Sequence, residues 1–408
     1  MLKVVVIGLG YVGLPLAIES AKAGHSTIGL DIDLNRINNL NIGISYLEDI
    51  ENISLKEQAS SGKFRASQDF SEINQADVVV ICVPTPLLNN HKPDLSAVES
   101  AANSITKYLT EGQLVILEST VEPETTRKFL VPLLEKGSGL KREEFDVVFS
   151  PERIDPTNKK WTLKNTPKIV AGLTNKASAR AVDFYSKFTD NVIVVDSLEV
   201  AETAELLENS FRLVNISFIN ELSIFCQKLG IDVNDVIKAA ATKPYGYMPF
   251  YPSIGVGGHC IRVDPSYLSY KAEQLGLKAN FIDLANQLNR DMPKTVARKV
   301  QLELNGSLKN KRIQIAGVAY KSNVSDIRES PSLVLINELE QLGAEVSWFD
   351  PLVGSIGNQK SEPLDSQIDL GLIVSPHSNM DFSLWKNSGI KVLDLSANNV
   401  NYGWPKFL

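Results

Sequence analysis

Residues 255–264 bring together the side chains best suited to covalent chemistry. Cys260 follows closely after three glycines, and Asp264 stands four residues beyond it. A thiolate in a loop is a competent nucleophile, and glycines let a backbone approach a ligand closely. We therefore predict that this loop is the reaction centre. On this stretch alone the alternative, a glycine-rich turn with an incidental cysteine, stays open.

The chain has two other cysteines, Cys82 and Cys226. Three scattered cysteines are too few for a disulfide framework or a thiolate metal cluster, so we expect no metal and a reducing, cytoplasmic compartment. Cys82 falls within an apolar run at residues 77–83, and Cys226 lies near the end of a helical stretch. We predict that both belong to the core, because a buried thiol behaves as a small apolar side chain.

A second chemical motif stands near the N-terminus. Residues 3–7 are typical of a buried parallel strand, Gly8-Leu9-Gly10-Tyr11-Val12-Gly13 follows at once, and residues 14–23 have helical composition. In this context the glycines let a backbone turn meet a pyrophosphate at the positive end of the helix, and the last glycine lets helix and strand pack closely. The motif predicts a dinucleotide site that includes Gly8, Gly10, Tyr11, Val12 and Gly13.

Asp31 follows the next predicted strand, at residues 27–30, about twenty residues beyond the glycines. A carboxylate there can accept both ribose hydroxyls and would repel a 2′-phosphate, so NAD is favoured over NADP. Arg36 weakens that preference, because a nearby arginine can accommodate a phosphate. The alternative is a solvated acidic turn formed by Asp31 and Asp33.

Polar residues also follow other predicted strands. The apolar runs at 77–83, 114–117 and 147–149 precede Thr85, Thr120 and Glu152. Because the carboxyl ends of strands line the ligand crevice of a doubly wound sheet, we expect both threonines to point toward cofactor or substrate. Strands at 169–172 and 192–195 complete an α/β unit that ends near Asp196.

The middle of the chain is predicted to be helical. Residues 198–229 contain no glycine or proline and repeat apolar residues every three or four positions, which predicts one long helix that links two domains and forms a homodimer face. Aromatic and proline residues at 247–253 suit a base or a sugar face. Another helix is predicted at 279–300, with a break at Pro293.

A second βα pattern fills the C-terminal part, with strands predicted at 312–316, 345–349, 368–374 and 392–395 and a helix at 332–342. It lacks a GxGxxG turn, so we do not expect a second dinucleotide site of the same kind. The predicted class is α/β, with two Rossmann-like doubly wound domains joined by a long central helix and a helical middle region. The predicted domains are residues 1–196, 197–300 and 301–408.

Length and charge limit the remaining possibilities. A chain of 408 residues exceeds the size of a single core. Its net charge of −7 does not suggest a nucleic-acid or anionic-membrane surface. The N-terminal apolar run is shorter than a signal peptide needs, and no apolar run approaches the roughly twenty residues of a membrane span.

Taken in order, the motifs resemble those of the nucleotide-sugar 6-dehydrogenases along nearly the whole chain. The Ser-Pro-Glu-Arg and Glu-Asn-Ser-Phe-Arg stretches are most similar to the UDP-N-acetylglucosamine branch. The matching segments are residues 8–15, Val83-Pro84-Thr85-Pro86, Glu118-Ser119-Thr120-Val121, Ser150-Pro151-Glu152-Arg153, Leu206-Leu207-Glu208-Asn209, residues 255–265, Ala319-Tyr320-Lys321 and residues 326–331.

The resemblance implies oxidation of a hydroxymethyl group to a carboxylate, with two NAD consumed. Cys260 would attack the intermediate aldehyde to give a thiohemiacetal, whose oxidation leaves a thioester that water hydrolyses. Asp264 would assist proton transfer, Thr120 and Asn209 would position water and the reacting oxygen, and Glu152 would act as a general base. NAD would be bound by the glycine turn, Asp31, Arg36, Thr85 and Thr120.

The substrate implied is a UDP-sugar, and the product would serve surface polysaccharide synthesis. UDP-N-acetylglucosamine is favoured, with UDP-glucose and UDP-N-acetylmannosamine as rivals. For Arg328, a salt bridge with Asp326 or Glu329 is the alternative role. Beyond Glu152 and Asn209, the resemblance assigns substrate binding to Phe250, Tyr251, Gly257, Gly258, Lys321 and Arg328.

Two residues depart from the family pattern. The family usually carries a lysine four residues before the asparagine that Asn209 matches, and this chain has Glu205 there. That lysine stabilises an oxyanion, and losing one such group typically costs about a hundredfold or more. Three explanations for Glu205 are open. Another cation, Arg212 or Lys243, takes the place of the lysine; or the helix register is misjudged; or the chain is a weakly catalytic nucleotide-sugar-binding homologue. Arg262 replaces a proline and would add positive charge near the cysteine.

Overall fold

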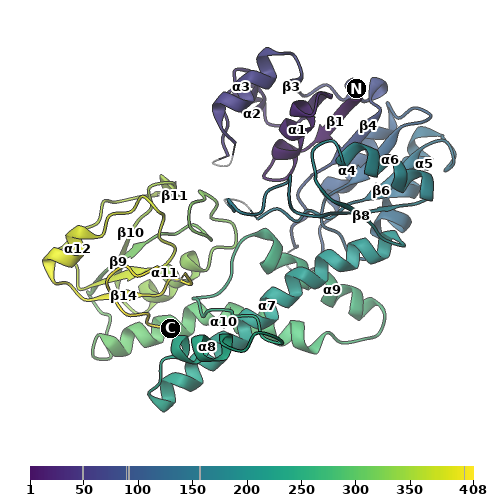
Figure 1. Ribbon diagram of the computed structural model, residues 1–408. Coiled ribbons are helices and arrows are strands. Elements are labelled where there is room, and N and C mark those ends of the chain that lie inside the picture. Colours follow the sequence, from purple (N-terminus) through teal and green to yellow (C-terminus); the bar gives the residue numbers. More distant parts are fainter. Residues whose placement is uncertain (48–49, 89, 91, 156–157, 399) are drawn as a thin grey trace. The chain divides into compact units, whose positions relative to one another are not determined.

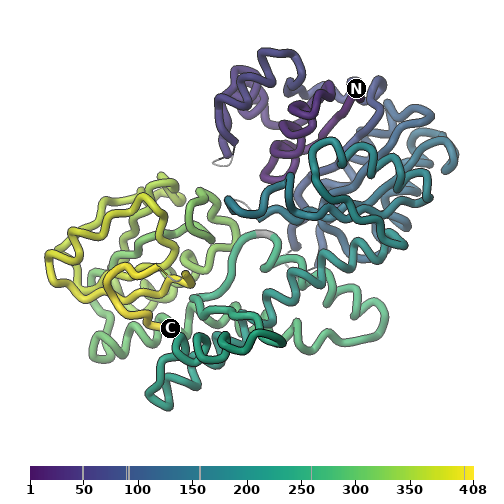
Figure 2. The backbone as a smooth tube through the Cα atoms, viewed as in Figure 1, coloured from purple at the N-terminus to yellow at the C-terminus, as the bar shows by residue number. Residues whose placement is uncertain are grey.

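The structure is a computed structural model that describes residues 1–47, 50–88, 90, 92–155, 158–398 and 400–408 (Figure 1 and Figure 2). Its chain forms two compact units. The first consists of Met1–Glu208 and Tyr270–Leu277, and the second of Asn209–Ser269 and Lys278–Leu408. The three-domain division at residues 196 and 300 stays a prediction. Helices α7 (Leu198–Leu229) and α9 (His259–Gln274) contribute to both units.

The first unit is built on an eight-stranded sheet with the order β3-β2-β1-β4-β5-β6-β7-β8. All neighbouring strands are parallel except β6 and β7, which run antiparallel. The order from β3 to β6 is that of an open dinucleotide-binding sheet. The strands are β1 (Lys3–Ile7), β2 (Ser26–Leu30), β3 (Phe64–Ser67), β4 (Val78–Ile81), β5 (Leu114–Leu117), β6 (Asp146–Phe149), β7 (Lys168–Gly172) and β8 (Val192–Val194).

Two apolar cores cover the two faces of this sheet. The central strands consist of residues such as Val78–Ile81 that are buried on both faces, which is typical of parallel sheets. One core includes buried residues of α1 (Gly13–Lys22), α2 (Leu34–Asn41), α3 (Asn52–Ser60) and α6 (Asn175–Tyr185). The other includes α4 (Ser96–Thr106), α5 (Val131–Ser138) and the start of α7.

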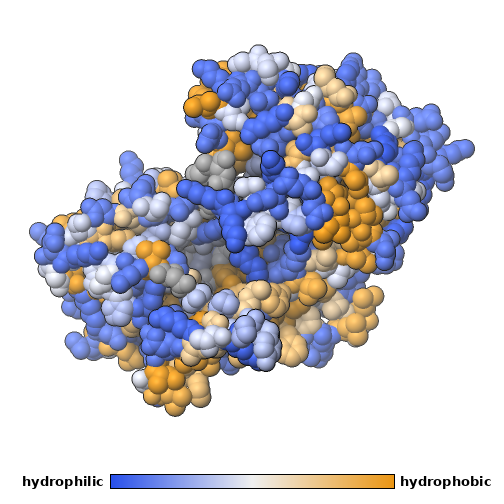
Figure 3. All heavy atoms as spheres, viewed as in Figure 1, coloured by the Kyte–Doolittle hydropathy of each residue, from blue (hydrophilic) through white to orange (hydrophobic). Residues whose placement is uncertain are grey.

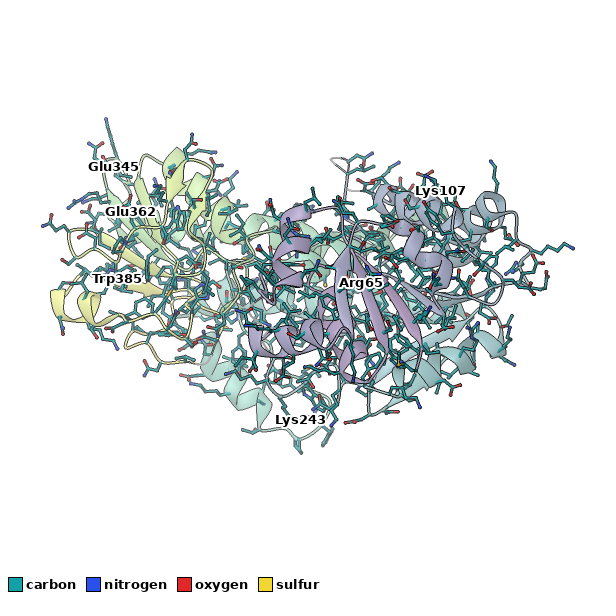
Figure 4. The ribbon with its side chains drawn as sticks, turned by 90° about the horizontal axis from the view of Figure 1, so that it is seen from above. Arg65, Lys107, Lys243, Glu345, Glu362 and Trp385 are labelled. Atoms are coloured by element: carbon teal, nitrogen blue, oxygen red, sulfur yellow. The ribbon has the colours of Figure 1, made fainter. Side chains whose placement is uncertain are left out.

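The second unit contains a four-stranded parallel sheet with the order β10-β9-β13-β14. Trp385 of α12 is completely buried at this sheet and donates a hydrogen bond to the Asp365 carbonyl (Figure 4). The elements are α8 (Val233–Ala241), α10 (Asn280–Glu303), β9 (Arg312–Ala316), α11 (Pro331–Gln341), β10 (Glu345–Phe349), β11 (Ser355–Ile356), β12 (Gln359–Lys360), β13 (Leu370–Ile373), α12 (Ser383–Ser388) and β14 (Val392–Asp394).

The predicted fold class is confirmed, and so is the long helix at 198–229, which α7 matches residue for residue. The predicted break at Pro293 is wrong, because α10 continues through this residue. Met292, Val296 and Val300 are buried in the core of the second unit. Packing of that apolar face offsets the roughly 3 kcal/mol that an interior proline costs a helix.

The turn after β9 repeats the backbone geometry of the turn after β1. Gly8 and Gly317 have φ angles of 89° and 87°, which favour glycine. Asp350 at the end of β10 accepts hydrogen bonds from the backbone N–H groups of Val318, Ala319, Leu352 and Val353 and pairs with buried His377. Its carboxylate is therefore occupied in holding this turn.

Within the described ranges, no helix is both long and apolar enough to cross a bilayer.

Glu202 ties α7 to the segment before α5. Its carboxylate accepts the backbone N–H groups of Glu124 at 2.6 Å and Thr126 at 2.9 Å. Burial raises the pKa of Glu202 to about 7, although these hydrogen bonds oppose the rise. The group therefore titrates near neutral pH in the folded protein.

Glu202 should make stability depend on pH. Its ordinary pKa is 4.5 and its folded pKa about 7, so its contribution is complete below pH 4.5 and is lost as the pH rises through 7. The loss amounts to roughly 3 kcal/mol. Urea unfolding at pH 5 and pH 8 should show this fall in the free energy of unfolding, and a smaller fall in Glu202→Gln. An equal fall in both proteins would contradict the assignment.

Candidate active site

The glycine turn after β1 has the shape that a pyrophosphate requires. A Cβ on Gly8 would lie 2.6 Å from the Cys82 carbonyl oxygen, and one on Gly13 would lie 1.9 Å from the Gly8 oxygen, so both positions exclude side chains. A Cβ on Gly10 would meet no atom within 4 Å, which leaves its backbone open to a ligand. Gly13 begins α1, whose N-terminus favours an anion.

Asp31 lies at the end of β2, as predicted. Its Oδ2 accepts the Leu9 N–H and its Oδ1 accepts the Asp33 N–H, both at 2.9 Å. Arg36 lies 3.6 Å from Asp31 Oδ2 and 5.1 Å from the centroid of the Tyr46 ring. Because Arg36 pairs with these acidic and aromatic neighbours, it is poorly disposed to take a 2′-phosphate. These residues fit NAD.

Two threonines follow the carboxyl ends of neighbouring strands. Thr85 is buried after β4, and half-buried Thr120 follows β5. Thr120 Oγ1 donates a hydrogen bond to Glu205 Oε1 at 2.8 Å. Glu205 is only 3% exposed, so this carboxyl group is an interior neighbour of Thr120.

Glu152 follows β6 and lies in a cluster of buried charges. Lys168 Nζ is 3.4 Å from Glu152 Oε2 and 3.1 Å from Glu118 Oε2. Tyr185 donates a hydrogen bond to Glu118. The sequence analysis did not consider Lys168, because its partners are 16 and 50 residues away in the chain.

The prediction that Cys260 lies in a loop is wrong. Helix α9 begins at His259, so the cysteine lies in its first turn and is exposed, whereas Cys82 and Cys226 are buried as predicted. A helix N-terminus favours a thiolate, because the helix dipole is positive there. Cys82 follows Ile81, the last residue of β4, rather than lying within the strand.

Asp264 lies one turn after Cys260 in α9 and is completely buried. Its Oδ2 accepts a hydrogen bond from Asn209 Nδ2 at 2.7 Å, which brings two predicted site residues together. Burial raises the pKa of Asp264 well above its ordinary value, and the Asn209 hydrogen bond opposes this rise. No hydrogen-bond partner of Asp264 Oδ1 is present in the part of the chain that the structure describes.

Amide side chains that the sequence analysis missed hold the glycine loop. Asn289 of α10 accepts the Val256 N–H at 2.7 Å and donates to the Val256 carbonyl at 3.1 Å. Asn220 of α7 accepts the Ser253 N–H at 2.8 Å. The available signal was an asparagine on the apolar face of each helix, where a polar residue needs a partner.

Gly257 and Gly258 are required by close packing within the second unit. A Cβ on Gly257 would lie 2.5 Å from the Glu329 carbonyl oxygen, and one on Gly258 would lie 2.6 Å from the Tyr320 ring. The Gly258 N–H also donates to the Arg328 carbonyl at 3.1 Å. The glycine loop therefore lies against residues 320–329, the second segment predicted to bind substrate.

The other predicted substrate residues have structural contacts. Phe250 stacks edge-on against Phe211 at 5.7 Å between ring centroids, and Tyr251 packs with it against α7 and α8. Lys321 is half-buried. Arg328 forms a bidentate pair with Asp326, with its closest distance at 2.6 Å, so the salt bridge considered as its alternative role is present.

The structure narrows the explanations for Glu205. Helix α7 is continuous from Leu198 to Leu229, so Glu205 lies one turn before Asn209 on the same helix. Arg212 and Lys243 are both exposed, and Lys243 lies over the Tyr245 ring at 5.0 Å and at the surface in Figure 4. Arg262 was expected to add positive charge near Cys260. Its guanidinium instead pairs with Glu329 at 3.3 Å, so that charge is balanced by a carboxylate.

The fold and the glycine turn define a dinucleotide-binding α/β protein, and comparisons with known proteins give its family. Residues 2–189 match the NAD binding domain of the UDP-glucose/GDP-mannose dehydrogenase family, residues 199–291 its central domain and residues 314–382 its UDP binding domain. The chain belongs to this family. It is an NAD-dependent nucleotide-sugar dehydrogenase with an NAD-binding domain.

The relatives have two different sugars in their names. The chain is 38% identical over 359 residues to UDP-N-acetyl-D-glucosamine 6-dehydrogenase from Pseudomonas aeruginosa, covering 87% of this chain and 84% of that protein. It is 37% identical over 354 residues to UDP-N-acetyl-D-mannosamine dehydrogenase from Methanococcus maripaludis, covering 86% and 79%. The structure of UDP-D-ManNAc dehydrogenase from Pyrococcus horikoshii superposes with a TM-score of 0.89 at 30% identity, covering 99% and 97%.

Asp31→Asn should weaken the use of NAD and relax its preference over NADP. The substitution removes a charged acceptor for the ribose hydroxyls, and a hydrogen bond to a charged group contributes about 1.5–3 kcal/mol. We expect kcat/KM for NAD to fall roughly tenfold to a hundredfold, and the NADP/NAD ratio to rise. The control is Asp33→Asn, since Asp33 caps α2 from an exposed position. Equal effects of both substitutions would contradict the role of Asp31.

Proposed function

We propose that this enzyme oxidises the C6 hydroxymethyl group of a UDP-sugar to the carboxylate in two steps, with Cys260 as the nucleophile. The observation that carries the proposal is the exposed Cys260 at the start of α9, one turn from a buried Asp264 that Asn209 holds. A dehydrogenase that stops at the aldehyde has no use for a thiol in this position. The thiol retains the aldehyde covalently between the two oxidations.

The chemistry follows from the thiol. The glycine turn, Asp31, Arg36, Thr85 and Thr120 would hold NAD, which would supply the hydride acceptor for each oxidation. Cys260 Sγ bonds to the aldehyde carbon and gives a thiohemiacetal, whose oxidation leaves a thioester. Water then adds to the thioester carbon, the carbon–sulfur bond breaks, and the thiolate is restored. The balance is one alcohol, one water and two NAD⁺ converted to one carboxylic acid, two NADH and two protons.

The remaining site residues are proposed to move protons and position oxygens. Burial raises the pKa of Asp264 well above its ordinary value, which suits this carboxyl group to exchange a proton with the reacting oxygen. Asn209 orients that carboxyl group through its hydrogen bond. Thr120 positions water, and Glu152 accepts a proton from it.

The proposed substrate is a UDP-N-acetylhexosamine, with UDP-N-acetylglucosamine favoured over UDP-N-acetylmannosamine and UDP-glucose. Similar identity to relatives named for both N-acetyl sugars supports the class and leaves the choice to experiment. Substrate binding is assigned to residues of the glycine loop, of the aromatic stretch before it and of the segment packed against it. They are Phe250, Tyr251, Gly257, Gly258, Lys321 and Arg328, with Glu152 and Asn209 at the sugar.

Glu205 motivates a second candidate, a nucleotide-sugar-binding homologue with weak catalysis. A buried carboxyl group beside Thr120 supplies no positive charge for an oxyanion. The two cations considered as substitutes, Arg212 and Lys243, are exposed within the second unit. This candidate predicts tight UDP-sugar binding with negligible turnover.

NADH formation separates the two candidates. Purified protein with NAD and UDP-N-acetylglucosamine should form two NADH per sugar consumed, faster than with UDP-N-acetylmannosamine or UDP-glucose. Cys260→Ala should lower turnover by about a thousandfold or more, because nucleophile loss removes the covalent path. Buried Cys226→Ala is the matched control and should retain turnover. No NADH with any UDP-sugar, or unchanged behaviour of Cys260→Ala, would refute the proposed function.

We also infer a homodimer that forms through α7. Phe211, Phe218 and Phe225 recur every seven residues, so they form one stripe, and each side chain is about half exposed. Figure 3 shows apolar residues reaching the visible surface over the helical region that Figure 1 labels α7, α8 and α10. Such a stripe is typical of an interface between copies.

Sedimentation should detect this dimer. The 44.9 kDa chain should sediment at twice its mass, and Phe218→Asp should shift it toward monomer because a charge would be buried in the interface. Leu302→Asp, at an exposed position of α10, is the control and should remain dimeric. A monomeric wild type would contradict the inference.

A further inference from the structure

A buried cluster in the first unit connects three strands beside Glu152. Lys168 Nζ lies between Glu118 Oε2 at 3.1 Å and Glu152 Oε2 at 3.4 Å. The Tyr185 hydroxyl of α6 donates to Glu118, and Lys168 lies over the Tyr185 ring at 5.3 Å. Glu118, Lys168 and Tyr185 are buried, while Glu152 keeps the most contact with solvent of the three charged side chains.

The reversal of β7 brings the lysine to this place. Strand β7 runs antiparallel to β6, with Val148 opposite Gly172 and Phe149 opposite Ala171. The first residue of β7, Lys168, therefore lies beyond the carboxyl end of β6, where Glu152 follows. In a parallel β7 the same residue would start at the opposite edge of the sheet.

The cluster holds two carboxyl groups and one ammonium. Burial raises the pKa of Glu118, and Lys168 opposes that rise. Burial lowers the pKa of Lys168, but Glu118 and Glu152 together raise it above its usual value. The lysine therefore stays charged, and the two carboxyl groups compete for it.

Stabilisation alone is a weak reason for such a cluster. Buried ion pairs cost about as much in desolvation as they return in attraction, and apolar replacements are often as stable. The cluster is better explained if its charges control the ionisation and orientation of Glu152. Among the residues that the structure describes, the Ile154 N–H also donates to Glu152 Oε1, and the Cys82 thiol, which burial keeps neutral, lies in the same surroundings. Arg153 pairs with Glu208 instead.

We propose that Lys168 is a positioning residue that holds Glu152 ionised and oriented, and that Glu118 limits this effect by sharing the lysine. The inference rests on the proposed role of Glu152 as general base. It predicts opposite consequences for two substitutions. Without the lysine, two buried carboxylates face each other and one must take a proton. Without the Glu118 charge, the ammonium acts on Glu152 alone.

The experiment measures kcat against pH for the NAD-dependent oxidation of UDP-N-acetylglucosamine, or of whichever UDP-sugar the wild type turns over. Lys168→Met should move the acidic limb of the profile to higher pH by roughly one unit or more, and Glu118→Gln should move it to lower pH. Lys168→Arg should return the limb close to that of the wild type. Shifts in the same direction, or no shift, would overturn the proposal.

Two controls keep the result interpretable. Glu152→Gln should remove the acidic limb together with most of the turnover; if it leaves both intact, the proposed role of Glu152 fails independently of Lys168. If Lys168→Met does not fold, Glu118→Gln decides, because it must still lower the limb. A purely structural role would lower the melting temperature of the variants and leave the limb where it is.

Discussion

The carboxyl edge of the eight-stranded sheet is the constraint on which the first unit depends. Its central strands are buried on both faces, so a polar side chain within them would lose water without gaining a partner. Polar groups therefore gather in the residues that follow the strands. The glycine turn, Asp31, Thr120 and Glu152 all follow strands of this sheet.

Charges near that edge are paired, and the pairing limits what each group can do. Lys168 is shared by two carboxyl groups, so little of its charge is left for a reacting oxyanion. The Thr120 hydroxyl donates a hydrogen bond to Glu205, so toward any other group its oxygen acts as an acceptor. Glu205 therefore does more than replace the family's lysine, because it also fixes the direction in which the Thr120 hydroxyl donates its hydrogen bond.

In the second unit, the backbone that carries Cys260 is positioned by amide side chains and close contacts rather than by charge. Asn220 and Asn289 fix the backbone ahead of α9, and Gly257 and Gly258 allow that backbone to lie against residues 320–329. The helix then fixes the spacing between Cys260 and Asp264. Because these contacts form a packed loop, the position of the thiol depends on residues that do no chemistry.

The sequence by itself determined the local elements and the family motifs. Short-range patterns predict every strand of the two large sheets except β3, together with the helix at 198–229, the glycine turn and Asp31. Apolar periodicity and glycine geometry act within a few residues, so they can be read from the sequence. The small β11-β12 pair was not predicted. The order of the motifs along the chain was likewise sufficient to indicate the family.

Only the tertiary structure decided which distant side chains meet. It placed Cys260 in a helix, carried α10 through Pro293, paired Arg262 with Glu329, and brought Lys168 to Glu118 and Glu152. Each outcome depends on packing or charge pairing between residues far apart in the chain. The energies of these packing and charge-pairing interactions depend on how a strand reverses or which helix face is buried. A local sequence pattern does not predict either.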